Sequence, residues 1–351
     1  METEWVSVRV WSNLDFEYEL AAGLAYRPGP QLQKLCDRWK AILRLIPDYT
    51  EAQLGPGDGG RLLCWGVTPR VEAISGSSAF PSSKLVKSIN DKRFSHRLEV
   101  EFGCALAGAQ VVHDMEQLEL AVESCPHDWV VKHPFGVGGR ERVTGKGGRG
   151  LSDAGRWAEA RFREGWSLLF EPWAYRRREF SFHYQIQPDK KIDFVGHCGL
   201  VSDESGAFRG NRVLPRGQVA EGFESTTLRA VERLAELGYW GPVGIDAFVG
   251  ELGEAAVTRP LMEINARYSF GRLALELRRW IPEGWCLQWW HPKRRRLAEV
   301  EARCDEFPPD VGKSFRTGVF QLPRVADPEG GTGSYLVVAR DPEMLDELTS
   351  S

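Results

Sequence analysis

The chain has 351 residues, of which 42% are hydrophobic and 27% charged, and its formal net charge is −4 at pH 7. This length allows two or three domains with sizeable cores, and the composition is that of an ordinary globular protein. Because the net charge is small, we expect neither nucleic-acid binding nor membrane-surface binding. The chain begins METEWVSVRVW, without the apolar stretch of a signal peptide, and it has no apolar run long enough to span a membrane.

Cysteine and tryptophan usage narrows the class further. The seven cysteines are dispersed and include no Cys-x-x-Cys pair, which predicts neither a zinc ribbon nor a redox pair. An odd, dispersed set is typical of a reducing compartment, so we expect a cytoplasmic protein. The thirteen tryptophans suit core and interdomain packing, and an aromatic substrate pocket is the alternative.

The first elements predict a small α/β unit. Residues 4–11 alternate apolar and polar positions like a strand, residues 30–46 have helical spacing, and residues 61–67 read as another strand. We expect this N-terminal unit to occupy residues 1–84. The acids Asp15, Glu17 and Glu19 follow its first strand; they predict a solvated acidic face, with a substrate role as the alternative.

Strands and helices alternate in the middle of the chain. Residues 108–114 and 128–134 read as strands around a helix at 114–124, and a further helix is predicted at 152–165. We expect these elements to form one lobe over residues 85–170.

Three strand-like segments follow, up to residue 201, and then amphipathic helices at 224–238 and 270–280. A strand and a short helix close the chain. We expect a second lobe at residues 171–290 and a C-terminal extension at residues 291–351.

The most informative segment is TRPLMEINARYSFG, in which Glu263, Asn265 and Arg267 stand two apart, while Asp246 interrupts the earlier apolar run VGIDAF. If both runs are strands, the first three share one face. Carboxylate and amide oxygens suit Mg²⁺, with Mn²⁺ as an alternative. A guanidinium beside them suits charge on a transferring phosphoryl group. Solvated charges on a surface hairpin are the alternative, and Pro260 predicts that the second strand starts late or lies at a sheet edge.

A glycine-rich segment follows Lys132. Residues 136–150 contain seven glycines, and dense glycine lets backbone amides turn inward to form an anion-binding nest. Lys132 and the downstream acids favour a phosphate-binding lid that includes Gly136, Gly138 and Gly139. A flexible surface loop is the alternative.

Lys92 before a helix, Lys132 with its glycine-rich loop, Glu171 and Glu179 around a connector, and the acid–amide strand resemble, in this order, the ATP-grasp superfamily of carboxylate–amine ligases. The resemblance covers roughly residues 85–280. It implies the ATP-grasp fold, of α/β (α+β) class, preceded by an N-terminal α/β domain.

The resemblance also implies roles for individual residues. Lys92 and Lys132 would contact ATP phosphates, Glu171 and Trp173 would belong to the adenine-binding hinge, and Glu179 would contact the ribose. Arginines fill a connector that is one residue longer than in many relatives. For Glu179, the alternative is therefore a solvated acid paired with one of these arginines.

Many ATP-grasp ligases have an arginine two residues before the first metal acid, where this chain has Gly244. The EINAR segment resembles the carbamoyl-phosphate-synthetase branch, in which Arg267 would supply that charge. A structural salt bridge is the alternative for Arg267.

Two further groups complete the candidates. Arg209 and Arg212, in a segment expected to be a polar loop, would hold a substrate carboxylate or the γ-phosphate, or else form a solvated basic loop. We expect His183, His197 and Cys198 to be core residues.

The sequence therefore predicts an ATP-dependent ligase that joins a small-molecule carboxylate to an amine through an acylphosphate and releases ADP and phosphate. Mg²⁺ would be held by Asp246, Glu263 and Asn265. The alternatives are an ATP-grasp phosphotransferase acting on a hydroxyl and a nucleotide-binding module without turnover. A homodimer is compatible with the sequence.

Overall fold

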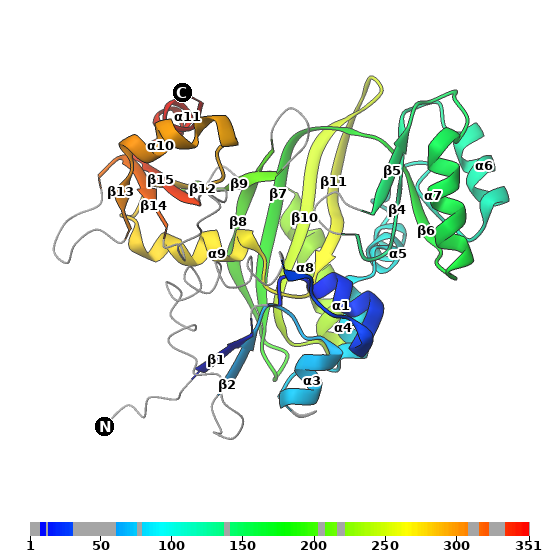
Figure 1. Ribbon diagram of the computed structural model, residues 1–351, viewed down its shortest axis with the longest axis horizontal. Coiled ribbons are helices and arrows are strands. Elements are labelled where there is room, and N and C mark those ends of the chain that lie inside the picture. The colour runs from blue at the N-terminus through cyan, green and yellow to red at the C-terminus, as the bar shows by residue number, and fades with distance from the viewer. Residues whose placement is uncertain are drawn as a thin grey trace.

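The computed structural model describes residues 8–11, 13–30, 61–75, 79–136, 141–202, 208–215, 222–307, 316–322 and 334–350 (Figure 1). The helix expected at 30–46 lies, apart from Pro30, outside the described residues, as do Gly138 and Gly139. None of the helices that the structure describes is long and apolar enough to cross a bilayer.

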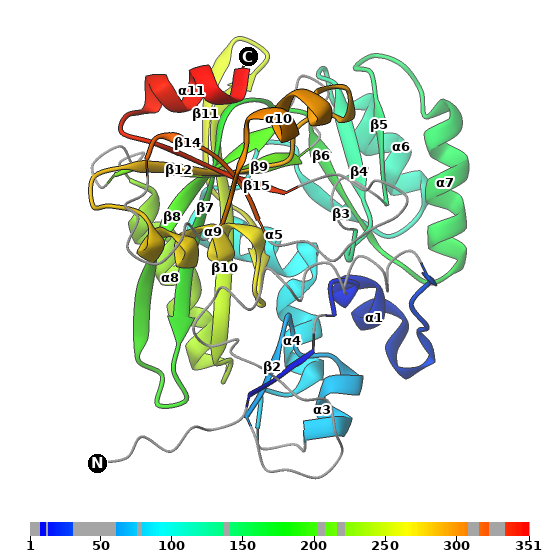
Figure 2. The ribbon, with the colours of Figure 1, turned by 60° about the vertical axis from the view of Figure 1, so that its left-hand side comes forward.

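The N-terminal unit lies at one end of the molecule, away from the C-terminal helix α11 (Figure 2). Its two described strands pair in parallel, and Asn13 joins their ends by donating to the carbonyl of Gly66 at 2.8 Å and accepting from the amide of Trp65 at 3.1 Å. Its elements are β1 (Val8–Trp11), α1 (Phe16–Ala22), a short 3₁₀ helix (Gly23–Ala25), β2 (Arg61–Cys64) and α3 (Pro69–Ser75).

Two consecutive helices, α4 (Ser83–Asn90) and α5 (Lys92–Phe102), lead away from this unit and run along strand β11. Ser82 and Asp91 cap them by accepting hydrogen bonds from first-turn amides. Their polar side chains also bind β11 directly. Ser95 accepts from the amide of Ile264 at 3.1 Å, and Asn90 accepts from the amide of Ala266 at 3.0 Å.

A four-stranded antiparallel sheet of order β3-β6-β4-β5 forms the first lobe. Its helices pack on one face around Trp129 and Phe170 (Figure 1). The elements are β3 (Gln110–Val112), α6 (Met115–Glu123), β4 (Trp129–Lys132), β5 (Arg142–Gly145), α7 (Ser152–Arg163) and β6 (Leu168–Pro172).

The expectation of a continuous loop over residues 136–150 is wrong, because β5 runs through it and pairs with β4. Gly145 is required by packing: a Cβ there would lie 2.0 Å from the Trp129 ring. A Cβ on Gly147 would likewise lie 2.4 Å from the carbonyl oxygen of Pro126. These two glycines therefore serve the lobe's own packing.

The second sheet has nine strands in the order β11-β10-β7-β8-β9-β12-β15-β14-β13, and its described neighbours pair antiparallel except β13 and β14. The strands are β7 (Tyr175–Ile186), β8 (Ile192–Ser202), β9 (Phe208–Val213), β10 (Gly241–Leu252), β11 (Ala255–Asn265), β12 (Cys286–Trp290), β13 (Asp305–Glu306), β14 (Gly318–Gln321) and β15 (Tyr335–Ala339). The expected boundary at residue 290 thus falls inside this sheet. β11 is an edge strand, one of the two outcomes that Pro260 predicts.

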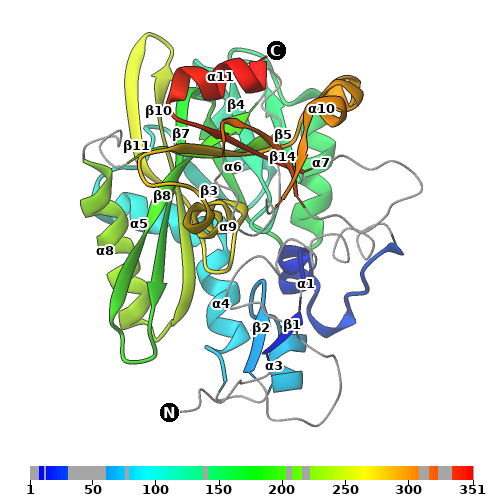
Figure 3. The same cartoon turned by 90° about the vertical axis from the view of Figure 1, so that its left-hand side faces the viewer.

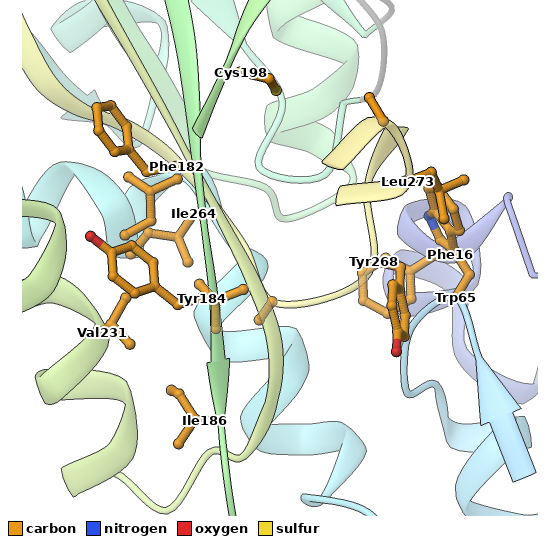
Figure 4. Close-up of a cluster of buried hydrophobic side chains, with 14 of the residues drawn as sticks. Phe16, Trp65, Phe182, Tyr184, Ile186, Cys198, Val231, Ile264, Tyr268 and Leu273 are labelled. Atoms are coloured by element: carbon orange, nitrogen blue, oxygen red, sulfur yellow. The ribbon is translucent and has the colours of Figure 1, made fainter. Parts of the chain in front are cut away.

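Helices cover both faces of the nine-stranded sheet. Helix α8 (Phe223–Glu236) covers one face (Figure 3), where its Phe223 packs on Phe180 and Phe182. Figure 4 shows Phe182 on the same side of β7 as Val231 of α8. On the other face, Gly271 of α9 (Phe270–Leu277) lies so close to His183 that a Cβ would be 2.5 Å from Nε2. A 3₁₀ turn (Arg278–Trp280) follows α9, and the remaining helical elements are the 3₁₀ turn Arg294–Arg296, α10 (Leu297–Arg303) and α11 (Pro342–Ser350).

Candidate active site

The central pair of carboxylates comes from neighbouring antiparallel strands. The register places Asp246 of β10 directly opposite Glu263 of β11, and on the other side opposite Ser181 of β7. Opposed residues share a sheet face, so these side chains form one row. Asn265 lies two residues after Glu263 on β11, and its Nδ2 donates to Asp246 at 3.1 Å. The structure therefore brings together the three side chains that the sequence nominates as metal ligands.

The charges in this row are only partly compensated. Burial, and then the neighbouring Glu263, raise the pKa of Asp246 to about 6. Burial also acts to raise the pKa of Glu263, but the Lys92 ammonium, 2.5 Å from its Oε1, lowers it overall. Two adjacent acids with one bonded ammonium form a site that a cation would stabilise.

The donor chemistry fits Mg²⁺. No group of three or more His, Cys, Asp or Glu side chains that could hold a metal occurs among the described residues. Two carboxylates with an amide oxygen make a smaller, all-oxygen set. Mg²⁺ accepts such a set because it keeps water and phosphate oxygens as its remaining ligands.

A second charge network lies where the two sheets meet. Lys132 of β4 is ion-paired with Glu171 of β6. The Nη2 of Arg259, on β11, donates to Glu171 at 2.6 Å and to Glu99 of α5 at 2.7 Å. Arg259, Glu171 and Glu99 are each no more than 2% exposed. We call Glu99, Arg259, Glu171 and Lys132 the buried network.

The two acids of the buried network differ. Burial raises the pKa of Glu99 to about 7. Burial acts in the same direction on Glu171, but Arg259 and Lys132 hold its pKa well below the usual range. Sequence reasoning missed Arg259 altogether. The expected hinge acid, Glu171, has its carboxylate directed at two cations.

The connector between the two sheets carries Trp173, which follows β6 and precedes β7. Its amide donates to the carbonyl of Asp128 at 2.6 Å, and Arg142 of β5 lies over its ring, 5.3 Å from the centroid. Glu179 is on the same face of β7 as Ser181, because residues two apart in a strand share a face. Glu179 also accepts from Arg176 at 2.6 Å, which is the ion pair named above as the alternative.

Arg267 joins the second lobe to the N-terminal unit. Its Nε donates to Glu17 of α1 at 2.7 Å, and its charge acts to lower the pKa of both Asp246 and Glu263. The guanidinium is thus salt-bridged and also electrostatically coupled to the acid pair.

The expectation of a solvated acidic face at Asp15, Glu17 and Glu19 is wrong. Their exposed fractions are only 6%, 7% and 2%. The physical reason lies in distant partners: Arg267 binds Glu17, and Arg70 lies 3.7 Å from Glu19.

The two substrate arginines lie in strand β9, which corrects the expected polar loop. Asn211 donates to Cys198 at 3.5 Å, on the face of the acid pair. Arg212 therefore points to the opposite face, where its Nε donates to Gln288 at 2.9 Å and its Nη2 lies 2.7 Å from Asp346. Arg209 lies at the beginning of the strand, and its carbonyl accepts from the amide of His291 at 2.8 Å.

Two of the three residues expected in the core lie there, since His183 and Cys198 are each 1% exposed, whereas His197 is only partly buried. Burial lowers the pKa of His183 to about 3 and raises that of Cys198 to about 12, so both are neutral at pH 7. Gly136 is buried in the turn after β4, and that turn contacts Lys92, whose amide donates to the carbonyl of Pro134 at 3.2 Å.

No protein-family model matches the chain. In sequence, 193 residues are 25% identical to the butirosin acyl-carrier protein–L-glutamate ligase of Niallia circulans, over 53% of this chain and 45% of that protein. The match therefore spans less than half of that relative.

The fold is shared with solved structures at low identity. A biotin carboxylase complex with β-γ-ATP from Campylobacter jejuni has a TM-score of 0.60 at 12% identity, over 97% of this chain and 84% of that chain. An N5-carboxyaminoimidazole synthetase from Staphylococcus aureus, complexed with ADP, has a TM-score of 0.57 at 11% identity, over 97% and 95%. The predicted fold is confirmed: the chain has the ATP-grasp fold of these enzymes, and in sequence it is similar to the ligase named above.

Proposed function

We propose that the chain is an ATP-dependent carboxylate–amine ligase that forms an amide through an acylphosphate and releases ADP and phosphate. The observation that carries the proposal is the convergence of Asp246, Glu263 and Asn265 on one sheet face, with Lys92 bonded to Glu263. The fold shared with ADP and ATP complexes supports ATP as the nucleotide.

Each group has a definite role in this reaction. Asp246, Glu263 and Asn265 would hold Mg²⁺, or alternatively Mn²⁺, and the ion would neutralise phosphate charge. Lys92 and Lys132 would bind phosphate oxygens, with the turn at Gly136 beside them. Alignment and charge neutralisation supply most of the catalysis that phosphoryl transfer requires.

The connector between β6 and β7 is the proposed binding region for the adenosine part of ATP. We assign Trp173, and Glu179 on the face of the acid pair, to this end of the site. Glu171 would act as a positioning residue, since its carboxylate holds Lys132. For the substrate we retain Arg209 but not Arg212, which pairs with Asp346 on the other face of the sheet.

The substrates in this proposal are a small-molecule carboxylate and an amine. The name of the sequence relative gives L-glutamate and an acyl-carrier protein as the substrates of that enzyme, so both belong in the first panel tested. The dispersed cysteines, without a Cys-x-x-Cys pair, support a reducing location such as the cytoplasm.

The test is product analysis. Purified protein with ATP and Mg²⁺ is supplied with pairs of acids and amines, and ADP, phosphate and the organic product are measured. Amine-dependent ADP release with an amide product supports the ligase. A phosphate ester as the final product would identify a phosphotransferase, and ATP binding without ADP formation on any pair would identify a module without turnover.

A further inference from the structure

A partly open hollow lies between the N-terminal unit and the adjoining end of the nine-stranded sheet. Its volume is about 260 Å³. This exceeds the roughly 150 Å³ that accommodates a benzene ring and approaches the lower limit of about 300 Å³ for ligand pockets. Five aromatic residues dominate its described wall: Trp65, Phe80, Tyr239, Trp240 and Tyr268.

The aromatic wall is held in place by contacts between the two domains. The amide of Tyr268, after β11, donates to the carbonyl of Trp65, after β2, at 2.8 Å. Phe80 and Trp240 lie with their ring planes 7° apart and their centroids 6.3 Å apart. Tyr239 donates its hydroxyl to the carbonyl of Pro242 at 2.7 Å. Figure 4 shows Trp65 and Tyr268 beside Phe16 in the shared core.

The polar side chains of the wall are directed at the protein itself. Ser75 donates to the carbonyl of Val71 at 2.8 Å, and Gln185 donates to the carbonyl of Ile186 at 3.4 Å. The guanidinium of Arg267 is bound to Glu17. A wall of this kind selects an uncharged, apolar group, because a charged group would lose its hydration without gaining a partner.

The hollow adjoins the reacting end of the site. Ala266, Arg267 and Tyr268 line it and follow Asn265 directly in the chain. Three residues of extended chain span at most about 11 Å, so the Cα atoms of Asn265 and Tyr268 are no further apart than that. Arg267, which lines the hollow, is salt-bridged to Glu17, so one positive and one negative charge lie at this end of the hollow.

We propose that this hollow is the specificity pocket of the ligase reaction and takes an aromatic or bulky aliphatic group carried by one of the two small-molecule substrates. This inference rests on the proposed function. Either substrate can carry this group: Arg267 would face the carboxylate if the acid carries it, and Glu17 would face the ammonium if the amine does. The shared chemistry is an uncharged, ring-sized body attached to the reacting group.

The experiment uses the full chain with ATP and Mg²⁺ and follows equilibrium binding by calorimetry. Phenylpropanoate represents the acid and phenylethylamine the amine, with acetate and methylamine as the small counterparts. We expect one aromatic ligand to bind at least about tenfold more tightly than its small counterpart, as apolar pockets discriminate by such factors. Which of the two binds identifies the substrate that the pocket serves.

Three variants locate the binding. Ile74→Trp adds bulk at the rim, where Ile74 is 49% exposed, so folding is expected to be unaffected. It should weaken binding of the aromatic ligand about tenfold, and Phe80→Ala should weaken it through the loss of a wall ring. Leu228→Trp makes the same kind of change at an exposed position of α8, outside the pocket, and should leave binding unchanged.

The outcomes separate this inference from the proposed function. Equal binding of aromatic and small ligands, or aromatic binding that Ile74→Trp does not alter, would overturn the pocket even if amide-forming activity is found. Aromatic binding that responds to Ile74→Trp, without ADP formation on any acid–amine pair, would uphold the pocket as a ligand site and overturn the ligase.

Discussion

The two groups of buried charges on strand β11 differ in how completely they are neutralised. In the buried network, two carboxylates, Glu99 and Glu171, meet two cations, Arg259 and Lys132, and every member has a partner. Glu263 lies four residues after Arg259 on the same strand and forms the acid pair with Asp246. The bonded cation of this pair is Lys92, because the nearby Arg267 is salt-bridged to Glu17.

The degree of charge compensation distinguishes the buried network, which mainly stabilises the fold, from the acid pair, which can bind a cation. In the buried network, Glu99, Arg259 and Glu171 neutralise one another and hold the two sheets together, and Lys132, positioned by Glu171, is its one member proposed to contact a ligand. The acid pair has two carboxylates and one bonded ammonium, and the raised pKa of Asp246 reflects this excess of negative charge, which costs stability until a cation binds. The two groups also differ in burial, because Glu99, Arg259 and Glu171 are no more than 2% exposed whereas the Glu263 side chain is 29% exposed.

The largest expected effect of a substitution is a loss of ADP formation when a residue of the acid pair is replaced. Glu263→Ala removes a proposed metal ligand, and ADP formation should fall by more than about 10³-fold, because a bound metal stabilises transition-state charge by several kcal/mol. The melting temperature should change little, because the loss of the ion pair with Lys92 and the relief of repulsion with Asp246 act in opposite directions. Turnover and melting are measured on the same preparation.

The matched control is Glu251→Ala, which removes an acid of β10 that pairs with Arg177 near the surface. It should alter neither quantity. Near-normal turnover of Glu263→Ala with an unchanged Mg²⁺ requirement would remove Glu263 from the metal site.

The buried network should respond in the opposite way. Arg259→Met leaves Glu99 and Glu171 without their shared guanidinium, and breaking such a buried pair costs about 3–5 kcal/mol of unfolding free energy. Denaturant unfolding measures the loss. Arg177→Met, which breaks an exposed pair, should leave the unfolding free energy nearly unchanged. Equal stability of the Arg259→Met variant and the parent would contradict a structural role.

The sequence predicts the acid pair because its signal is local. Glu263 and Asn265 stand two apart in a strand, and Asp246 interrupts an apolar run, so the pattern is visible within a few residues. The ATP-grasp fold can be predicted from the sequence for a related reason, because its characteristic segments occur in a fixed order along the chain.

Arg259 has no such signal. Its partners, Glu99 and Glu171, lie 160 and 88 positions away, and a single arginine in a strand gives no indication of either. Glu17 was expected on a solvated face for the same reason, because Arg267, which binds it, is 250 positions away. Long-range charge pairing is the information that short patterns lack.

Arg267 shares features with both charge groups, because it forms a salt bridge with Glu17 and is also electrostatically coupled to the acid pair. If it stabilises the transferring phosphoryl group, Arg267→Ala should lower kcat and kcat/KM together by about 10²–10³, with ATP binding retained. Steady-state kinetics and nucleotide titration give these quantities.

Glu17→Gln is the matched variant for Arg267. It weakens the salt bridge but keeps the guanidinium, so it should lower stability and lower kcat far less than Arg267→Ala does. A stable protein with unaltered kinetics after Arg267→Ala would assign the phosphoryl charge to another cation, and Arg209 would be tested next.

The smallest effect concerns Glu99 and the dependence of stability on pH. Burial raises the native-state pKa of Glu99 from 4.5 to about 7, so between these values the native state binds more protons than the unfolded state. Its contribution to stability is therefore present at low pH and is lost as pH rises through about 7. At about 1.4 kcal/mol per pKa unit, the full loss amounts to about 3 kcal/mol or less.

Glu99→Gln should remove this dependence, because an amide does not titrate. The variant's unfolding free energy relative to the parent should rise steadily from pH 5 to pH 8, as measured by denaturant unfolding without metal. Asp246, whose pKa is also raised, titrates in both proteins and cancels in the difference. A difference that does not change with pH would mean that Glu99 stays ionised throughout, as a full partner of Arg259. The buried network would then be held by two permanent charges on one guanidinium, and Lys132 would be needed to balance it.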